Sequence, residues 1–232
     1  MKYPMQYRNK QSGFTLVEIA IVLVIIGLLL GGVLKGQEMI ENARIKSVVG
    51  DMNGVSAAYN SYLDRYHAIP GDETAAVMTA RGWTGTTGAT GATAGNGRLD
   101  VAIATTFTNA ANEQAGLWRA LRGSQLTSGD PLAPAGAASL PRAGTGGLIA
   151  VTASPYGLVG AAVCVSGLTA KQAAGIDAAV DGSPAVGSFG NQIGSVRGDS
   201  SATNPFNPLT TAPTGKAFDE NAAVTWTMCQ KV

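Results

Sequence analysis

The sequence has little charge and few side chains that bind metals. Charged residues make up 13% of its 232 residues, against ~25% in an average soluble domain. The formal net charge of +1 gives no strong attraction to nucleic acids or acidic partners. The one histidine is His67, and the two cysteines are Cys164 and Cys229. A catalytic or metal site needs several such groups to converge, so we expect His67 to lie at the surface or at a helix end.

Motifs for catalysis are missing as well. The sequence contains no glycine-rich phosphate loop, no nucleophile motif and no cluster with metal-ligand spacing. Two groups of oxygen ligands are candidates for calcium: Asp72 with Glu73 near the segment 95–100, and the pair Asp177 and Asp181. The spacing around Asp72 does not match an EF-hand loop. We therefore predict no enzyme activity, no cofactor and no metal site.

One long apolar run dominates the amino-terminal part of the chain. It extends from Phe14 to Leu34, and Glu18 is its only charged residue. At ~1.5 Å per helical residue the run is long enough to span a bilayer core of ~30 Å. A carboxylate inside hydrocarbon is costly and needs a partner. The preceding segment, Met1 to Gly13, contains three basic residues and no acid, which is expected on the cytoplasmic side: Lys2, Arg8 and Lys10.

These residues resemble the amino terminus of type IV prepilins and of the pseudopilins of type II secretion. The resemblance consists of a short basic leader ending in Gly13, the sequence Phe14-Thr15-Leu16-Val17-Glu18, and the unbroken apolar run. It covers roughly the segment from Gln11 to Tyr66. It implies that a membrane-embedded prepilin peptidase cuts after Gly13 and that the new terminal residue, Phe14, is N-methylated.

The position of the cleavage point has a physical meaning. A secretory signal peptide is cut after its apolar region, whereas Gly13 precedes the apolar region here. Cutting at Gly13 would remove the basic leader, keep the anchor and create an amine at Phe14, close to Glu18. In a filament that amine can neutralise the Glu18 carboxylate of the neighbouring subunit, because opposite charges attract strongly at low dielectric. Our hypothesis is that Glu18 sets the axial register. The alternative is a signal anchor with one stray acid.

The pattern after the apolar run predicts that the helix continues as an amphipathic segment. Apolar residues recur at helical spacing, and Pro70-Gly71 ends the pattern. This half should place its apolar stripe under a globular domain. The stripe consists of Ile45, Val48, Val49, Met52, Val55, Tyr59, Tyr62, Leu63 and Tyr66.

The remainder of the chain predicts short helices and strands. Helices are expected at Asn112–Leu121 and Thr169–Val180, the second with a capping box formed by Thr169 and Gln172. The tracts Thr84–Gly97 and Ser200–Lys216 predict loops. We interpret Arg197-Gly198-Asp199, at the edge of the second loop, as a chance tripeptide rather than an adhesion signal. Strands are predicted at Leu148–Ala153, Tyr156–Val165, Val186–Ile193 and Val224–Gln230.

These elements and the resemblance together predict an α+β, pilin-like fold. A long amino-terminal helix, transmembrane in its first half and amphipathic in its second, would pack on an antiparallel sheet of about four strands. We assign residues 1–13 to the leader peptide, 14–35 to the transmembrane and filament-core helix, 36–67 to the amphipathic half, and 68–232 to the globular head.

The two cysteines lie on the side that would face the periplasm or the exterior. An oxidising compartment favours a bridge between Cys164 and Cys229, and the alternative is two unpaired buried thiols. Many pilins have a comparable carboxy-terminal disulfide loop, so the resemblance also implies this pairing. The bridge would attach the carboxy terminus to the domain.

The predicted function is that of a structural subunit. The resemblance implies a type IV pilus, a helical homo-oligomer assembled from the inner membrane and extending outside the cell for adhesion, motility or uptake. Its partners would be copies of itself, the prepilin peptidase, the inner-membrane assembly platform and, before assembly, the membrane. The alternatives are a type II secretion pseudopilin and a minor tip pilin that binds DNA or a surface. DNA binding needs a basic stripe, but the basic residues are scattered: Arg81, Arg98, Arg119, Arg122, Arg142 and Lys171.

Overall fold

The computed structural model of the protein describes residues 13, 15–83, 94–109, 113–182 and 190–232. The chain divides into two compact units, the first reaching to Glu41 and the second extending from Asn42 to Val232. One long helix, α1 (Leu16–Tyr66), begins in the first unit and ends in the second.

The amino-terminal part of α1 exposes its apolar side chains. Every residue from Leu16 to Leu34 is exposed. Within the described part of the chain, α1 is the one helix that is long and apolar enough to cross a membrane. A continuous apolar surface of this size needs lipid or other protein to cover it.

The carboxy-terminal part of α1 has the predicted amphipathic pattern. Its buried face consists of Ile45, Val48, Met52, Val55, Ala58, Tyr59 and Tyr62. The helix ends where the backbone turns left-handed at His67, whose φ is +50°. The His67 N–H donates to the Leu63 carbonyl at 2.8 Å, and Pro70 follows. The predicted helix end near His67 is confirmed.

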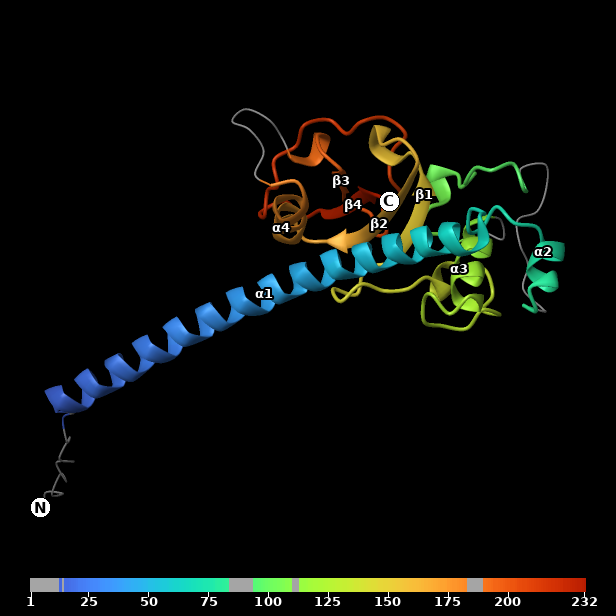
Figure 1. Ribbon diagram of the computed structural model, residues 1–232. Helices are drawn as coiled ribbons and strands as arrows, with labels where there is room; N and C mark the ends of the chain where they lie inside the picture. Colours follow the sequence, from blue (N-terminus) through green and yellow to red (C-terminus); the bar gives the residue numbers. More distant parts are fainter. Residues whose placement is uncertain (1–12, 14, 84–93, 110–112, 183–189) are drawn as a thin grey trace, which may run out of the picture. The chain divides into compact units, whose positions relative to one another are not determined.

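A four-stranded sheet forms the centre of the second unit (Figure 1). Its strands have the spatial order β1-β2-β4-β3, and every neighbouring pair is antiparallel. The prediction of a long helix on an antiparallel sheet of about four strands is confirmed. The strands are β1 (Ile149–Ala153), β2 (Ala161–Leu168), β3 (Val196–Ser201) and β4 (Thr225–Lys231).

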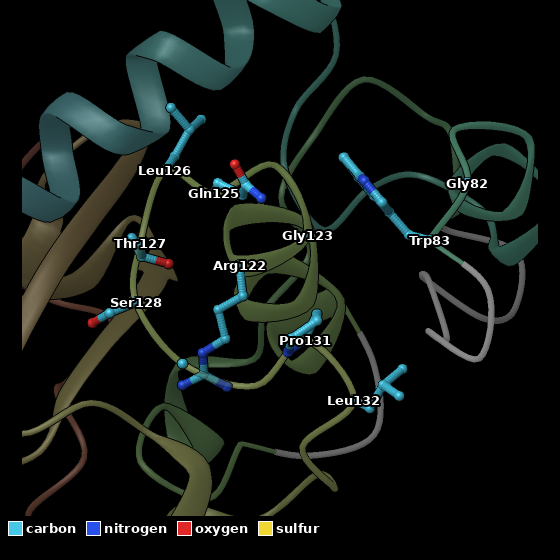
Figure 2. Close-up of a pocket in the computed structure, with 11 residues that line it drawn as sticks. Gly82, Trp83, Arg122, Gly123, Gln125, Leu126, Thr127, Ser128, Pro131 and Leu132 are labelled. Carbon is cyan, nitrogen blue, oxygen red and sulfur yellow. The ribbon is translucent and has the colours of Figure 1, made fainter.

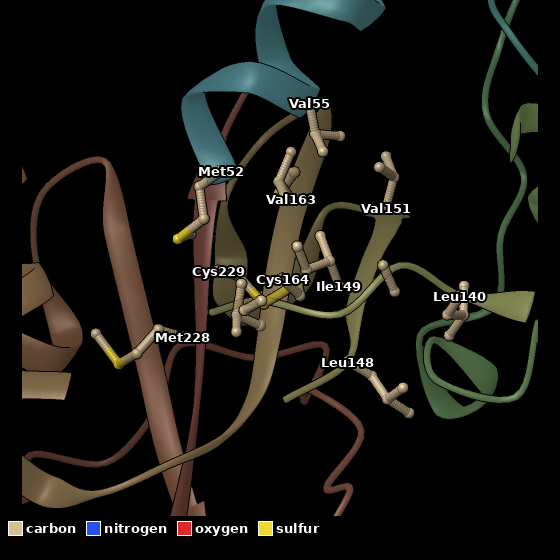
Figure 3. Close-up of a cluster of buried hydrophobic side chains, with 14 of the residues drawn as sticks. Met52, Val55, Leu140, Leu148, Ile149, Val151, Val163, Cys164, Met228 and Cys229 are labelled. Atoms are coloured by element: carbon tan, nitrogen blue, oxygen red, sulfur yellow. A yellow bond between two sulfur atoms is a disulfide. The ribbon is translucent and has the colours of Figure 1, made fainter. Parts of the chain in front are cut away.

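Both faces of this sheet are covered. Side chains alternate between faces along a strand, and Val151 and Val163 lie on the face near Met52 and Val55 of α1 (Figure 3). On the same face Gln230 Nε2 donates to Asn53 Oδ1 of α1 at 3.0 Å. Two loop segments, which contain Val101 and Phe206, cover the opposite face. The hydroxyl of Thr152 donates to the Val101 carbonyl at 3.5 Å, and that of Thr227 donates to the Phe206 carbonyl at 2.8 Å.

Two of the four predicted strands lie elsewhere than expected. The strand predicted from Tyr156 begins only at Ala161, because Tyr156 has a left-handed backbone (φ +53°) in the short helix η3 (Pro155–Gly157). The prediction of a strand at Val186–Ile193 is wrong for those of its residues that the structure describes. Residues 186–189 lie outside the described residues, Gly190–Gln192 is the short helix η4, and the strand next to β4 begins at Val196.

The described residues of the unit also form three shorter α-helices: α2 (Ala75–Ala80), α3 (Glu113–Gly123) and α4 (Ala170–Val180). The predicted capping box of α4 is confirmed, with Thr169 and Gln172 each accepting from the backbone N–H of the other at 3.2 and 3.1 Å. The predicted start of α3, Asn112, lies outside the described residues. Two further short 3-10 helices are η1 (Ile103–Thr105) and η2 (Ala137–Ser139).

Candidate functional site

The first turn of α1 holds the acid of the predicted assembly site. The Glu18 carboxylate accepts hydrogen bonds from the Thr15 backbone N–H at 2.8 Å and from the Thr15 hydroxyl at 2.9 Å. The Glu18 N–H donates in return to Thr15 Oγ1 at 3.3 Å. Thr15 therefore caps the helix and orients the carboxylate at its amino-terminal end. Gly13 is exposed nearby, whereas Phe14 lies outside the described residues.

This geometry brings an acid and a helix start together within an apolar surface. A carboxylate at a helix amino terminus interacts favourably with the unpaired N–H groups and with the helix dipole. Thr15 therefore supplies Glu18 with local hydrogen bonds but not with an opposite charge. The predicted pairing of Glu18 with the Phe14 amine of a neighbouring copy stays a prediction.

The two cysteines meet in the sheet. Cys164 of β2 and Cys229 of β4 are directly opposite each other, with an S–S distance of 2.08 Å, and both side chains are buried. The bridge encloses α4, β3 and the β3–β4 connection, a sequence separation of 65 residues. A loop of this size is typically stabilised by ~2–5 kcal/mol when cross-linked.

The β3–β4 connection inside the bridge is attached to its surroundings by buried polar groups. Asn191 Nδ2 donates to the carbonyls of Gly198 and Thr214, each at 3.1 Å, and Asn191 Oδ1 accepts from Lys216 N–H at 3.2 Å. The Lys216 ammonium pairs with Asp199 at 2.5 Å. These contacts hold the connection as a defined surface.

The tripeptide Arg197-Gly198-Asp199 lies within β3. From the sequence we expected it at the edge of a loop. Arg197 donates to the Tyr156 carbonyl at 3.1 Å, and Asp199 is buried against Lys216. Both charged side chains therefore serve the fold.

The first candidate calcium pair has internal partners. Asp72 accepts hydrogen bonds from the backbone N–H groups of Gly95, Asn96 and Gly97 at 2.7, 3.0 and 2.7 Å. The Glu73 carboxylate is buried, pairs with Arg81 and accepts the Tyr62 hydroxyl. Burial and that hydrogen bond raise the pKa of Tyr62. Within the described ranges no group of three or more His, Cys, Asp or Glu residues could hold a metal ion.

The second pair, Asp177 and Asp181, divides into two different environments. Asp181 accepts hydrogen bonds from Ser195 N–H, Ser195 Oγ and Val196 N–H at 3.0, 2.6 and 2.7 Å. Asp177 is buried, and its Oδ1 has no hydrogen-bond partner among the described residues. Burial, helped by the nearby charge of Asp181, raises the pKa of Asp177 to about 6.

A hollow of about 690 Å³ opens beside the carboxy-terminal end of α3 (Figure 2). Trp83 forms one wall, and Arg122 lies on the other side with its Nη2 donating to the Ser139 carbonyl at 2.6 Å. Burial lowers the pKa of Arg122. The lining combines no nucleophile with a base, so it supports no catalytic assignment.

Two partners in these sites were missed from the sequence. Thr15 stands three residues before Glu18, which is the capping-box spacing that correctly identified Thr169 and Gln172. The same signal could therefore have found Thr15. The pairing of Arg81 with Glu73 has no comparable local signal, because the two residues are eight positions apart, on either side of α2.

Comparison with known families agrees with the amino-terminal geometry. A family model described as the prokaryotic N-terminal methylation motif matches residues 8–34. This motif is the signature of type IV pilins and pseudopilins, and the chain resembles those proteins over these residues. The motif implies processing by a prepilin peptidase and, in general terms, pilus assembly. Comparison with curated proteins and with solved structures gave no match.

Proposed function

We propose that this chain, which carries the amino-terminal signature of type IV pilins and pseudopilins, is a structural subunit of a type IV pilus. The observation that supports this most directly is the exposed apolar surface of α1 from Leu16 to Leu34, with Glu18 near its start. Before assembly this segment anchors the chain in the inner membrane. In the filament the same surface is covered by copies of itself.

The acid explains why a filament is preferred over a simple anchor. Glu18 lies near the beginning of an apolar segment, where a carboxylate without a cation is costly. Cleavage after Gly13 creates a cation at Phe14, and a neighbouring copy shifted along the axis can present it to Glu18. The acid then favours one axial position of the neighbour over others.

The second unit supplies the outer surface of the proposed filament. The Cys164–Cys229 bridge and the contacts of Asn191 hold its carboxy-terminal part in one conformation. A surface with few charges suits subunits that pack against one another. The head would face the periplasm before assembly and the exterior afterwards, where it mediates adhesion, motility or uptake.

A type II secretion pseudopilin is the second candidate, because pseudopilins carry the same motif. A minor tip pilin that captures DNA receives less support. Of the scattered basic residues, Arg81 is paired with Glu73 and Arg122 donates to a backbone carbonyl, so neither is available to a phosphate without breaking a contact.

The test is to shear filaments from cells and to analyse them by mass spectrometry. We expect this chain to dominate the filaments and to start at N-methylated Phe14. A Gly13→Val chain should retain the segment 1–13 and be absent from the filaments. If loss of the chain abolishes protein secretion but leaves the filaments unchanged, the pseudopilin assignment is correct instead.

A further inference from the structure

A second hollow, of about 350 Å³, lies beside α1 within the unit Asn42–Val232. Gly50 and Gly54, one helical turn apart, form its helical wall, and a Cβ added at either position would meet nothing within 4 Å. Its other lining includes the apolar side chains of Val55, Leu126, Trp118, Pro141 and Ile149. The hollow is therefore a notch with an apolar lining that two glycines leave open.

Two polar atoms at this notch lack partners. The Nε1 of Trp118 and the Oγ1 of Thr127 have no hydrogen-bond partner among the described residues, and both residues line the notch. Buried donors without partners are rare in folded proteins. Both atoms are buried, so an occupant would contact the apolar side chains of the lining and not these two atoms.

The same unit carries an apolar side chain that projects into solvent. Val159 is 78% exposed, more than the other large apolar residues exposed outside α1, of which Leu132 at 55% comes next. It lies in the turn between η3 and β2. The turn is anchored at its η3 end, because Tyr156 is buried and its N–H donates to the Leu209 carbonyl at 2.7 Å. Val159 is therefore presented on a fixed backbone.

We propose that the notch at Gly50 and Gly54 receives the Val159 turn of a second copy of this chain. The inference rests on the proposed filament. Projection and notch are different surfaces of one molecule, so their contact is heterologous and leaves a free notch and a free projection at the two ends. A heterologous contact forms a closed ring only if successive rotations bring the last copy back to the first. Otherwise the copies continue as an open helical filament.

The charges around the two surfaces are complementary. Asp51 lines the notch, and Arg98 lines the same small hollow as Val159. Arg98 is exposed, and no described residue forms an ion pair with it. The other charged residue of the notch, Arg142, donates to the Gly146 carbonyl at 3.0 Å. A copy that inserts Val159 would thus bring Arg98 toward Asp51.

The axial distance between the surfaces also fits a filament with parallel helices. Val159 shares its hollow with Tyr59, whereas the notch lies at Gly50 and Gly54. At ~1.5 Å per residue these positions are roughly 8–14 Å apart along α1. A neighbour displaced by about that step along the axis would bring its Val159 turn to the level of the notch.

Cysteine cross-linking in filaments tests the contact directly. We expect full-length chains carrying both Gly54→Cys and Val159→Cys to form a ladder of disulfide-linked multimers after mild oxidation of sheared filaments. Each single variant should give no ladder, and the native cysteines are already paired. A pair that combines Gly54→Cys with Ile193→Cys, an exposed position outside the turn, is the matched control.

The outcomes separate this inference from the proposed function. Filaments that contain the double variant but give only monomer overturn the contact and leave the filament function intact. Absence of the unaltered chain from filaments overturns both.

A blocking variant gives a second readout. Gly54→Leu fills the notch, and Leu also favours a helix, so the fold should be preserved. We expect filaments to contain about tenfold less of the Gly54→Leu chain than of the Ala57→Leu chain. Loss of the contact of one buried valine side chain would produce a factor of about this size. Ala57 is exposed on the same helix but does not line the notch. Equal incorporation of the two variants at equal membrane levels would overturn the contact.

Discussion

Thr15 donates two hydrogen bonds to Glu18, one from its backbone N–H at 2.8 Å and one from its hydroxyl at 2.9 Å. The acid of the proposed assembly site therefore has a local partner within its own chain. Assembly would add a positive charge to an acid that the helix start already orients.

A Thr15→Val substitution should loosen this start. It removes the hydroxyl bond to Glu18 and the acceptor for the Glu18 N–H while keeping the side-chain shape. We expect amide hydrogen exchange at residues 16–19 to become several times faster in the full-length chain in detergent, as loss of a helix cap implies. Thr15→Ser keeps the hydroxyl and should exchange like the unaltered chain. Equal rates for Val and Ser would mean that the hydroxyl does not cap α1.

Breaking the Glu73–Arg81 pair should be costly because both side chains are largely buried, at 8% and 20% exposed. Arg81→Met leaves the Glu73 carboxylate without its cation, and we expect a loss of about 3 kcal/mol in unfolding free energy. Urea unfolding of the full-length chain in detergent measures this. The surface pair Lys35–Glu38, 69% and 51% exposed, is the control, and Lys35→Met should cost less than about 0.5 kcal/mol. Similar losses for the two variants would contradict this explanation.

The buried carboxyl of Asp177 should make stability depend on pH. Its pKa is raised from 3.8 to about 6 by burial and by Asp181. The folded state therefore holds this proton more tightly than the unfolded state, so the contribution is full below pH 4 and is lost as the pH rises through about 6. We expect Asp177→Asn to raise the melting temperature at pH 7.5, with the difference shrinking toward zero below pH 4.

The matched control for Asp177 is Asp181→Asn. Asp181 accepts three hydrogen bonds from Ser195 and Val196, so its replacement should lower stability at pH 7.5. A lower melting temperature for both variants at pH 7.5 would show that Asp177 does not carry an unfavourable charge there.

A methyl group at Gly123 should disturb Trp83. A Cβ at this position would lie 2.9 Å from the indole ring. We expect Gly123→Ala to cost about 1–2 kcal/mol and to alter the tryptophan fluorescence, because the ring must move. Gly54→Ala, whose Cβ meets nothing, should instead stabilise α1 by about 1 kcal/mol without a fluorescence change. An unaltered emission spectrum in Gly123→Ala would show that the indole does not rest on this glycine.

Features that depend on residues close in the chain were predictable. The apolar run, the stripe from Ile45 to Tyr62 and the capping box of Thr169 and Gln172 arise from helical spacing, which is a local property. The helix end near His67 follows in the same way from Pro70-Gly71. The methylation motif is likewise one short stretch that includes Gly13 and Glu18.

The position of the third strand depended on distant residues instead. Apolar composition favoured Val186–Ile193, but β3 forms over Val196–Ser201, a segment that contains Arg197 and Asp199. That segment pairs along β4, Asp181 accepts the N–H groups at its start, and Lys216 neutralises Asp199. Composition could not show this, since a charged strand becomes favourable only when folding brings its partners into contact with it.

The order of residues was thus sufficient to establish an apolar helix with one acid near its start and a head built on a sheet. Which groups meet Asp72, Glu73 and Asp199 depended on the folded arrangement. So did the positions of the open notch and of the exposed valine on two different surfaces of one unit. The physical reason is range. Helical periodicity and caps act over three or four residues, whereas strand partners, hollows and the Lys216–Asp199 ion pair join residues that are farther apart in the sequence.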